Sequence, residues 1–196
     1  MRKRSVPSLA RQLQHAFAEH CPAGWQCVPE ARAVAVETEA VLGYAPQADL
    51  LFREALTGRR VWVELEVSRA DPVANHAKFA SAHLVTPFPA SDTFLAMVSN
   101  HVARGRRNLA AHTIGVMRAL GIWAFQTIPY EHPIFDGGRA WQHLQNSLGF
   151  DAVPLTDLPK PMINAFSRWL DQTGDSITVD GKGPVILLPP LCRLKP

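Results

Sequence analysis

The chain has 196 residues, of which 47% are hydrophobic and 19% are charged, and its formal net charge is +3. This composition is ordinary for a globular protein, and the length allows one domain, or one domain with an extension. No apolar run approaches the roughly 18 residues of a membrane span, and the N-terminus lacks the apolar segment of a signal peptide. The small positive charge is compatible with nucleic-acid binding but does not by itself indicate it.

The three cysteines, Cys21, Cys27 and Cys192, show no spacing typical of a metal site. A sparse and odd number of cysteines favours a reducing cytoplasm, where thiols stay free. A single bridge between Cys21 and Cys27 is the alternative.

The first predicted elements are a helix and a strand. Residues 8–20 carry an apolar stripe at helical spacing, and Pro22 and Gly24 follow it. Glu19, near the end of this helix, is a candidate for an acidic site, although such residues more often face solvent. A strand is predicted to start at Trp25.

Two structures are compatible with residues 31–43 (ARAVAVETEAVLG). The segment either continues the preceding strand or forms a helix that is closed by Gly43. The alternation of Val34 and Val36 favours the strand.

A strand with two different faces is predicted over residues 61–68 (VWVELEVS), where apolar residues alternate with others. Glu64 and Glu66 therefore point to the same side, roughly 6.5–7 Å apart. A valine-rich strand is expected inside a sheet, where two carboxylates are costly unless they are paired or bind a cation. The alternative is that both glutamates lie on the solvated face of an edge strand.

A second short apolar run, residues 48–53 (ADLLFR), precedes a turn that is predicted at Thr57–Gly58. This turn pairs the two runs as a hairpin and places Asp49 opposite Glu66 and diagonal to Glu64, so that all three acids share one face. Three carboxylates this close repel one another without a cation. Oxygen ligands on a rigid sheet suit magnesium or manganese, so the three acids are candidate metal ligands.

A helix is predicted to begin at Asp71–Pro72, because Asp is a good N-cap and Pro suits the first helical position. Apolar residues follow at helical spacing as far as Leu84. Lys78 lies beside this stripe, and its ammonium can reach the carboxylates if the helix packs across the strand ends. A surface lysine is the alternative.

The next predicted elements are a buried strand over residues 93–99, a helix over residues 106–120 that Gly121 ends, and an apolar strand over residues 122–128. The helix is expected to bury part of an apolar set: Leu109, Ile114, Val116, Met117 and Leu120. The order is helix, three strands, helix, strand, helix, strand. It predicts an α/β fold with a mixed central sheet and helices on both faces.

Polar residues gather where the strand over residues 93–99 ends and the next helix starts. Arginine side chains and the free amides of a helix start can hold phosphates, and the alternative is a solvated helix start. The candidate nucleic-acid-binding residues are Asn100, His101, Arg104, Arg106 and Arg107.

Two histidines on the helix that is predicted to start at Pro72 are possible ligands. His76 and His83 are seven residues apart, whereas zinc pairs on helices usually need a spacing of three or four. His76 is near enough to the acidic face to contact a phosphate, but a surface position is favoured.

The sequence changes character after residue 130. Residues 1–130 form the predicted core, and residues 131–196 form an extension packed on it, with short helices predicted over residues 139–148 and 161–172. The extension is a candidate for dimerisation or substrate recognition, and a simple cap on the core is the alternative.

The segments Pro46-Gln47-Ala48-Asp49 and Glu64-Leu65-Glu66 resemble the motif of the PD-(D/E)xK nuclease superfamily, which includes many restriction endonucleases. That motif is an acid on one strand followed by acid-x-lysine on the next, and the resemblance covers roughly residues 8–130. Glu66 stands where lysine is usual, as in the E-x-E variant of some members. Lys78 matches members in which the lysine has moved to the following helix.

This resemblance implies a restriction-endonuclease-like core and a divalent-metal-dependent endonuclease that hydrolyses DNA. It implies Asp49, Glu64 and Glu66 as ligands of Mg²⁺, with Mn²⁺ able to substitute, and these acids with Lys78 as catalytic residues. It further implies a homodimer that cuts both strands. The alternatives are a non-catalytic nucleic-acid-binding or assembly subunit with the same fold, and an unrelated α/β protein whose acids lie on the surface.

Overall fold

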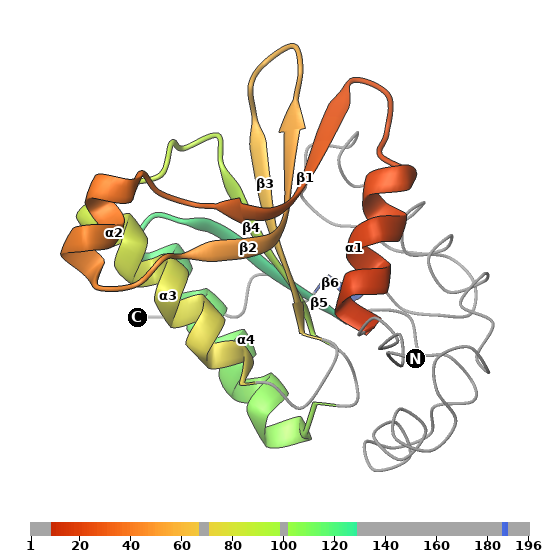
Figure 1. The fold of residues 1–196 in the computed structure, drawn as a ribbon. Coiled ribbons are helices and arrows are strands. Elements are labelled where there is room, and N and C mark those ends of the chain that lie inside the picture. The colour runs from red at the N-terminus through yellow and green to blue at the C-terminus, as the bar shows by residue number, and fades with distance from the viewer. Residues whose placement is uncertain (1–8, 67–70, 99–101, 129–185, 188–196) are drawn as a thin grey trace, which may run out of the picture.

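The structure is a computed structural model that describes residues 9–66, 71–98, 102–128 and 186–187 (Figure 1). Nearly all of the predicted extension, including its two helices, lies outside these residues. The elements in chain order are α1 (Leu9–Glu19), β1 (Trp25–Arg32), α2 (Val36–Leu42), β2 (Gln47–Glu54), β3 (Arg60–Glu66), α3 (Pro72–Val85), β4 (Thr93–Val98), α4 (Arg104–Ala119), β5 (Trp123–Ile128) and β6 (Ile186–Leu187).

The strands form one mixed sheet in the order β1-β2-β3-β4-β5-β6. β1, β2 and β3 are antiparallel neighbours, β3, β4 and β5 are parallel, and β6 pairs antiparallel with β5. The predicted α/β class with a mixed sheet is therefore confirmed. Within the described ranges, no helix is both long enough and apolar enough to cross a membrane.

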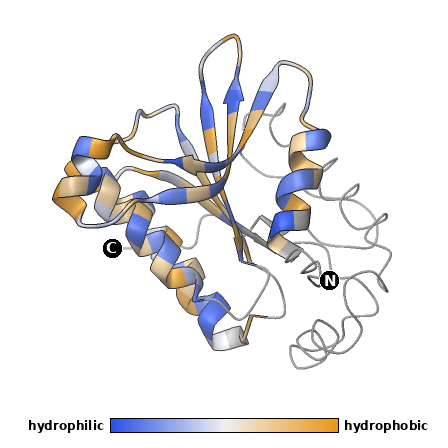
Figure 2. Ribbon diagram, viewed as in Figure 1, coloured by the Kyte–Doolittle hydropathy of each residue, from blue (hydrophilic) through white to orange (hydrophobic). Residues whose placement is uncertain are grey.

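Helix α1 covers the β1–β2 end of one sheet face. Its colours alternate between hydrophobic and hydrophilic in Figure 2, as expected of a helix with one buried side. Leu13 and Phe17 are buried, and the Phe17 ring meets Phe52 of β2 edge to face, with 6.0 Å between ring centroids.

Helices α3 and α4 cover the opposite face, where Trp62 of β3 and Phe94 of β4 pack on Phe79 of α3. Helix α4 buries Ile114 and Met117, as predicted. Leu109 and Val116 are 53% and 57% exposed, in keeping with the expectation that only part of the set is buried. The buried stripe of α4 runs through Ala110, Ile114 and Met117, and Leu109 and Val116 fall beside it.

Residues 36–42 form helix α2, so the favoured continuation of the strand is wrong and the helical alternative is confirmed. Gly43 has φ 75°, and its N–H donates to the carbonyl of Glu39, which ends the helix in a left-handed cap. Val36 is 62% exposed. The alternation of Val34 and Val36 therefore does not mark a strand face that packs on the core.

The β2–β3 hairpin has a different register from the predicted one. Arg53 pairs with Arg60, and Leu50 pairs with Val63, so the connection contains residues 55–59 instead of a tight turn between Leu56 and Arg59. Gly58 takes φ 73° inside this longer connection. The register is shifted by two residues, which keeps each side chain on its predicted face. Asp49 therefore lies level with Glu64 and not with Glu66.

Candidate active site

Glu64 and Glu66 lie inside the sheet, because β3 has β2 on one side and β4 on the other. The two residues are 3% and 2% exposed. This burial excludes the alternative of a solvated edge strand. Carboxylates at such depth need a charge partner, a proton or a cation.

Asp49 lies where β2 and β3 separate, just beyond their last paired residues, Leu50 and Val63. Its Oδ2 accepts a hydrogen bond from the backbone N–H of Leu65 at 2.7 Å. The carboxylate thus satisfies a strand donor that the ladder leaves open. This bond fixes the position of Asp49 close to Glu64.

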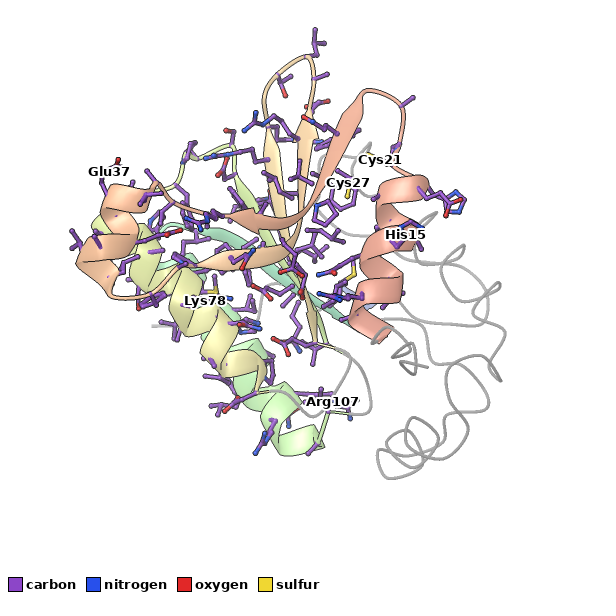
Figure 3. The ribbon with its side chains drawn as sticks, viewed as in Figure 1. His15, Cys21, Cys27, Glu37, Lys78 and Arg107 are labelled. Carbon is purple, nitrogen blue, oxygen red and sulfur yellow. The ribbon has the colours of Figure 1, made fainter. Side chains whose placement is uncertain are left out.

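Lys78 reaches the acids from α3, as predicted. Asp71 caps this helix by accepting from the N–H of Val73 at 3.2 Å, and Pro72 opens it. The Lys78 Nζ lies 3.3 Å from Glu64 Oε1 and donates to the carbonyl of Gln47 at 2.8 Å. Figure 3 labels Lys78 on α3. One ammonium therefore joins α3, β2 and β3.

Burial raises the pKa of all three acids. It raises the pKa of Glu64 to about 8, with Lys78 acting in the opposite direction and the charge of Asp49 adding to the rise. For Glu66, burial is opposed by a hydrogen bond that its Oε1 accepts from Asn75 of α3. A cation that binds here would displace a proton, so its affinity should increase with pH.

Asp49 and Glu64 provide the donor atoms that fit a divalent metal ion best. Glu64 Oε1 is buried, lies 3.3 Å from the Lys78 ammonium, and accepts no hydrogen bond of good geometry from the described residues. In the described ranges, no three acidic, histidine or cysteine residues converge closely enough to hold a metal ion alone. Mg²⁺ usually takes one or two carboxylates and completes its octahedron with water and substrate oxygens. Asp49 and Glu64, which lie level on neighbouring strands, are two carboxylates and meet that requirement.

Sequence reasoning missed two residues that surround Asp49. The Gln14 amide of α1 donates to Asp49 Oδ1 at 3.1 Å and to Glu30 Oε1 at 2.7 Å, and Gln14 is 6% exposed. Glu30, on β1, has φ 52°, a left-handed conformation that is rare for a non-glycine residue. Gln14 follows the buried Leu13, so a wider view of the helix stripe would have identified it. Glu19, the acid considered on this helix, is exposed.

The candidate nucleic-acid-binding residues are described in part. Asn100 and His101 lie outside the described residues, and Arg104 begins α4. Arg106 is exposed and Arg107 is half-buried, both near the start of α4, where Figure 3 labels Arg107. Their contact with nucleic acid stays a prediction.

The expectation that His76 lies on the surface or contacts a phosphate is wrong. His76 is fully buried between α3 and α4, its Nδ1 lies 2.7 Å from Thr113 Oγ1, and its ring meets Phe94 edge to face. Burial lowers its pKa to about 4. His83 also has a structural role, since its ring accepts from the N–H of Phe88 at 3.0 Å.

Cys21 and Cys27 are free thiols, as favoured by the sequence, and Cys192 lies outside the described residues. Burial raises the pKa of both described thiols. Neither is a candidate nucleophile, since burial disfavours the reactive thiolate.

Comparison with known proteins adds no further constraint: no protein-family model, curated protein or solved structure matches the chain.

Proposed function

We propose that this protein is a divalent-metal-dependent endonuclease with a restriction-endonuclease-like core, and that it hydrolyses phosphodiester bonds of DNA. The observation that carries the proposal is the meeting of Lys78 with the buried Glu64 beside Asp49. A structural core gains little from three buried carboxylates, because their desolvation is costly. Buried acids with raised pKa values beside a specific cation are typical of functional sites.

Asp49 and Glu64 would hold Mg²⁺ or Mn²⁺, and Glu66 would share the ion or orient the attacking water from its hydrogen bond with Asn75. The ion would lower the pKa of a coordinated water and neutralise charge on the scissile phosphate. Lys78 would stabilise the charge that develops on the phosphate oxygens. The protein thus contributes position and electrostatics, with no covalent intermediate.

One observation favours a second candidate, a non-catalytic nucleic-acid-binding or assembly subunit. Each acid already has a partner within the protein: Gln14 and the Leu65 N–H for Asp49, Lys78 for Glu64, and Asn75 for Glu66. Such a set of contacts would also stabilise a fold that had lost its chemistry.

The decisive test is cleavage of plasmid and single-stranded DNA with Mg²⁺, with Mn²⁺ and with EDTA. We expect metal-dependent cutting by the unmodified protein and its loss in Glu64→Ala. Glu37→Ala, which removes an exposed carboxylate of α2, is the matched control and should cut normally. DNA binding without cutting would favour the non-catalytic subunit, and neither binding nor cutting would contradict both candidates.

Two further parts of the proposal rest on the sequence: the homodimer on the resemblance, and the cytoplasm on the sparse and odd number of cysteines. A homodimer would place two sites on one duplex, and the cytoplasm would supply the reducing conditions that suit free thiols. Light scattering of the protein with and without duplex DNA tests the dimer.

A further inference from the structure

The acid site has a polar neighbour two strands away on the same sheet face. Glu64 of β3 pairs with Ala96 of β4, and Ala96 pairs with Gln126 of β5. Both pairings are parallel, and partners in a ladder point to the same side of a sheet. Glu64 and Gln126 therefore stand on either side of Ala96, with their Cα atoms about 10 Å apart across two strand spacings.

Each side chain carries an acceptor to which no described residue donates a hydrogen bond of good geometry, although the Lys78 ammonium lies 3.3 Å from that of Glu64. Glu64 and Gln126 are each 3% exposed, and the atoms concerned are Glu64 Oε1 and Gln126 Oε1. The Gln126 amide is oriented by its other end, because Nε2 donates to the backbone carbonyl of Arg107 at 3.3 Å. Its Oε1 consequently points away from that carbonyl. Buried acceptors of this kind are rarely left unsatisfied.

The residue between them has the smallest side chain on this face of β4. Ala96 is fully buried and has a single methyl group, while the flanking positions of β4 on this face hold the larger Phe94 and Val98. A donor placed over Ala96 would meet an acceptor on each side. Above about pH 8, where Glu64 is ionised, neither Glu64 Oε1 nor the Gln126 carbonyl can donate to the other.

We infer that a buried water over Ala96 donates one hydrogen bond to Glu64 Oε1 and one to Gln126 Oε1, and that Gln126 is a positioning residue for Glu64. The water supplies the two donors that these acceptors lack. Gln126 in turn is held by the first turns of α4 through Arg107. The bridge therefore connects the arginine-bearing start of α4 with the acid of the candidate metal site. The positioning role, though not the water itself, rests on the proposed function.

The water can be observed directly by NMR in protein labelled at alanine methyl groups. We expect the Ala96 methyl to show cross-peaks to water with opposite signs in NOESY and ROESY spectra, as a long-lived internal water gives. The exchangeable protons of the Lys78 ammonium are a second possible source of such a cross-peak, so a variant that keeps Lys78 is needed. Gln126→Met keeps Lys78 and the side-chain length but removes the acceptor, so the cross-peak should disappear in this variant.

The positioning role is measured by Mn²⁺ titration calorimetry. Gln126→Met should weaken Mn²⁺ binding about 10-fold, the lower end of the effect of losing a residue that orients a metal ligand. Gln26→Met, the same change at an exposed residue of β1, should leave the affinity unchanged.

A missing Ala96 cross-peak in the unmodified protein, or one that survives in Gln126→Met, would overturn the bridge. If Gln126→Met fails to fold, a crystal structure of the unmodified protein decides the question by the presence or absence of that water. Absence of Mn²⁺ binding by the unmodified protein would overturn the proposed function and the positioning role, while the Ala96 cross-peak would still decide the bridge.

Discussion

Glu64 is the residue whose ionisation ties the site to the stability of the fold. Its pKa is about 8 in the folded protein, against an ordinary value near 4.3 in an unfolded chain. Because the folded pKa is the higher one, the stabilisation from this group is complete below the unfolded pKa and is lost as the pH rises through the folded pKa. A buried acid with this behaviour opposes folding when it is ionised.

We therefore predict that the free energy of unfolding falls by about 2 kcal/mol between pH 6.5 and pH 8 through Glu64. Glu64→Gln should remove this slope, and Glu37→Gln, an exposed control on α2, should retain it. Urea denaturation without metal at four pH values measures the effect. His76, whose pKa is lowered to about 4, acts in the opposite direction and below this window. Equal slopes in the unmodified protein and in Glu64→Gln would contradict the prediction.

Substitution of Lys78 should affect catalysis and metal binding differently. Its ammonium lies 3.3 Å from Glu64 Oε1, where it competes with any metal ion for that oxygen. Lys78→Met should lower the cleavage rate roughly 100-fold, the cost of losing one preorganised stabiliser of the transition state. The same substitution should leave Mn²⁺ affinity unchanged or higher.

Single-turnover cleavage and calorimetry on Lys78→Met give the two readouts. Arg53→Met, which removes an exposed cation from β2, is the control for a simple change of net charge. A large loss of Mn²⁺ affinity in Lys78→Met would show that the lysine supports the ion and not the reaction.

At the scale of elements, the order of helices and strands could be predicted because each carries its own periodicity. The hairpin register could not be predicted, because it depends on a connection that spans residues 55–59 instead of a two-residue turn. The predicted sheet face of Asp49 is nevertheless correct, because a register shift of two residues leaves each side chain on the same face. Helix α2 was the alternative and not the favoured prediction, because a single glycine at its end, Gly43, is a weaker sequence signal than two alternating valines.

The parts of the site that sequence reasoning missed come from elements far apart in the chain. Gln14 approaches Asp49 from α1, and Asn75 approaches Glu66 from α3. Neither contact follows from local spacing, because each depends on how a helix packs against the sheet. Lys78 was predictable because its helix starts only a few residues after the strand that carries the glutamates.

Asp92, just before β4, joins the starts of β3 and β4 through an ion pair with Arg60 and a hydrogen bond from Trp62. Its carboxylate lies 3.0 Å from Arg60 Nε and 2.7 Å from Arg60 Nη2, and it accepts from Trp62 Nε1 at 2.9 Å. Asp92→Asn should destabilise the fold by about 2 kcal/mol, less than a fully buried pair would, because Arg60 keeps some exposure. Arg32→Gln breaks a surface ion pair and should cost less than about 1 kcal/mol.

Urea denaturation at pH 7 compares these two variants. A loss in Asp92→Asn no greater than in Arg32→Gln would show that the Arg60 and Trp62 contacts contribute little to joining the parallel strands.

At the scale of the whole molecule, side chains from helices on both faces of the sheet converge on the acids. Helix α1 contributes Gln14 from one face, α3 contributes Asn75 and Lys78 from the other, and the separation of β2 from β3 at Asp49 lets the two sets meet. Figure 1 shows α1 apart from α3 and α4, with the strands between them. A cation bound at this point would add a further link between three layers that already join through packing, hydrogen bonds and the Lys78–Glu64 ion pair.

Metal binding should consequently stabilise the entire described core and not a local loop. An ion that binds only the folded state at 100 times its Kd adds about 2.7 kcal/mol, which for a chain of this size raises Tm by about 5–10 °C. Differential scanning calorimetry with Mn²⁺ should show this rise, and EDTA should reverse it. The rise should be larger at pH 8 than at pH 6.5, because the ion must displace the proton of Glu64. Asp49→Asn and Glu64→Gln should lose it, while Glu37→Gln should keep it. An equal rise in Glu64→Gln would place the ion elsewhere and leave the buried acids without a metal to explain them.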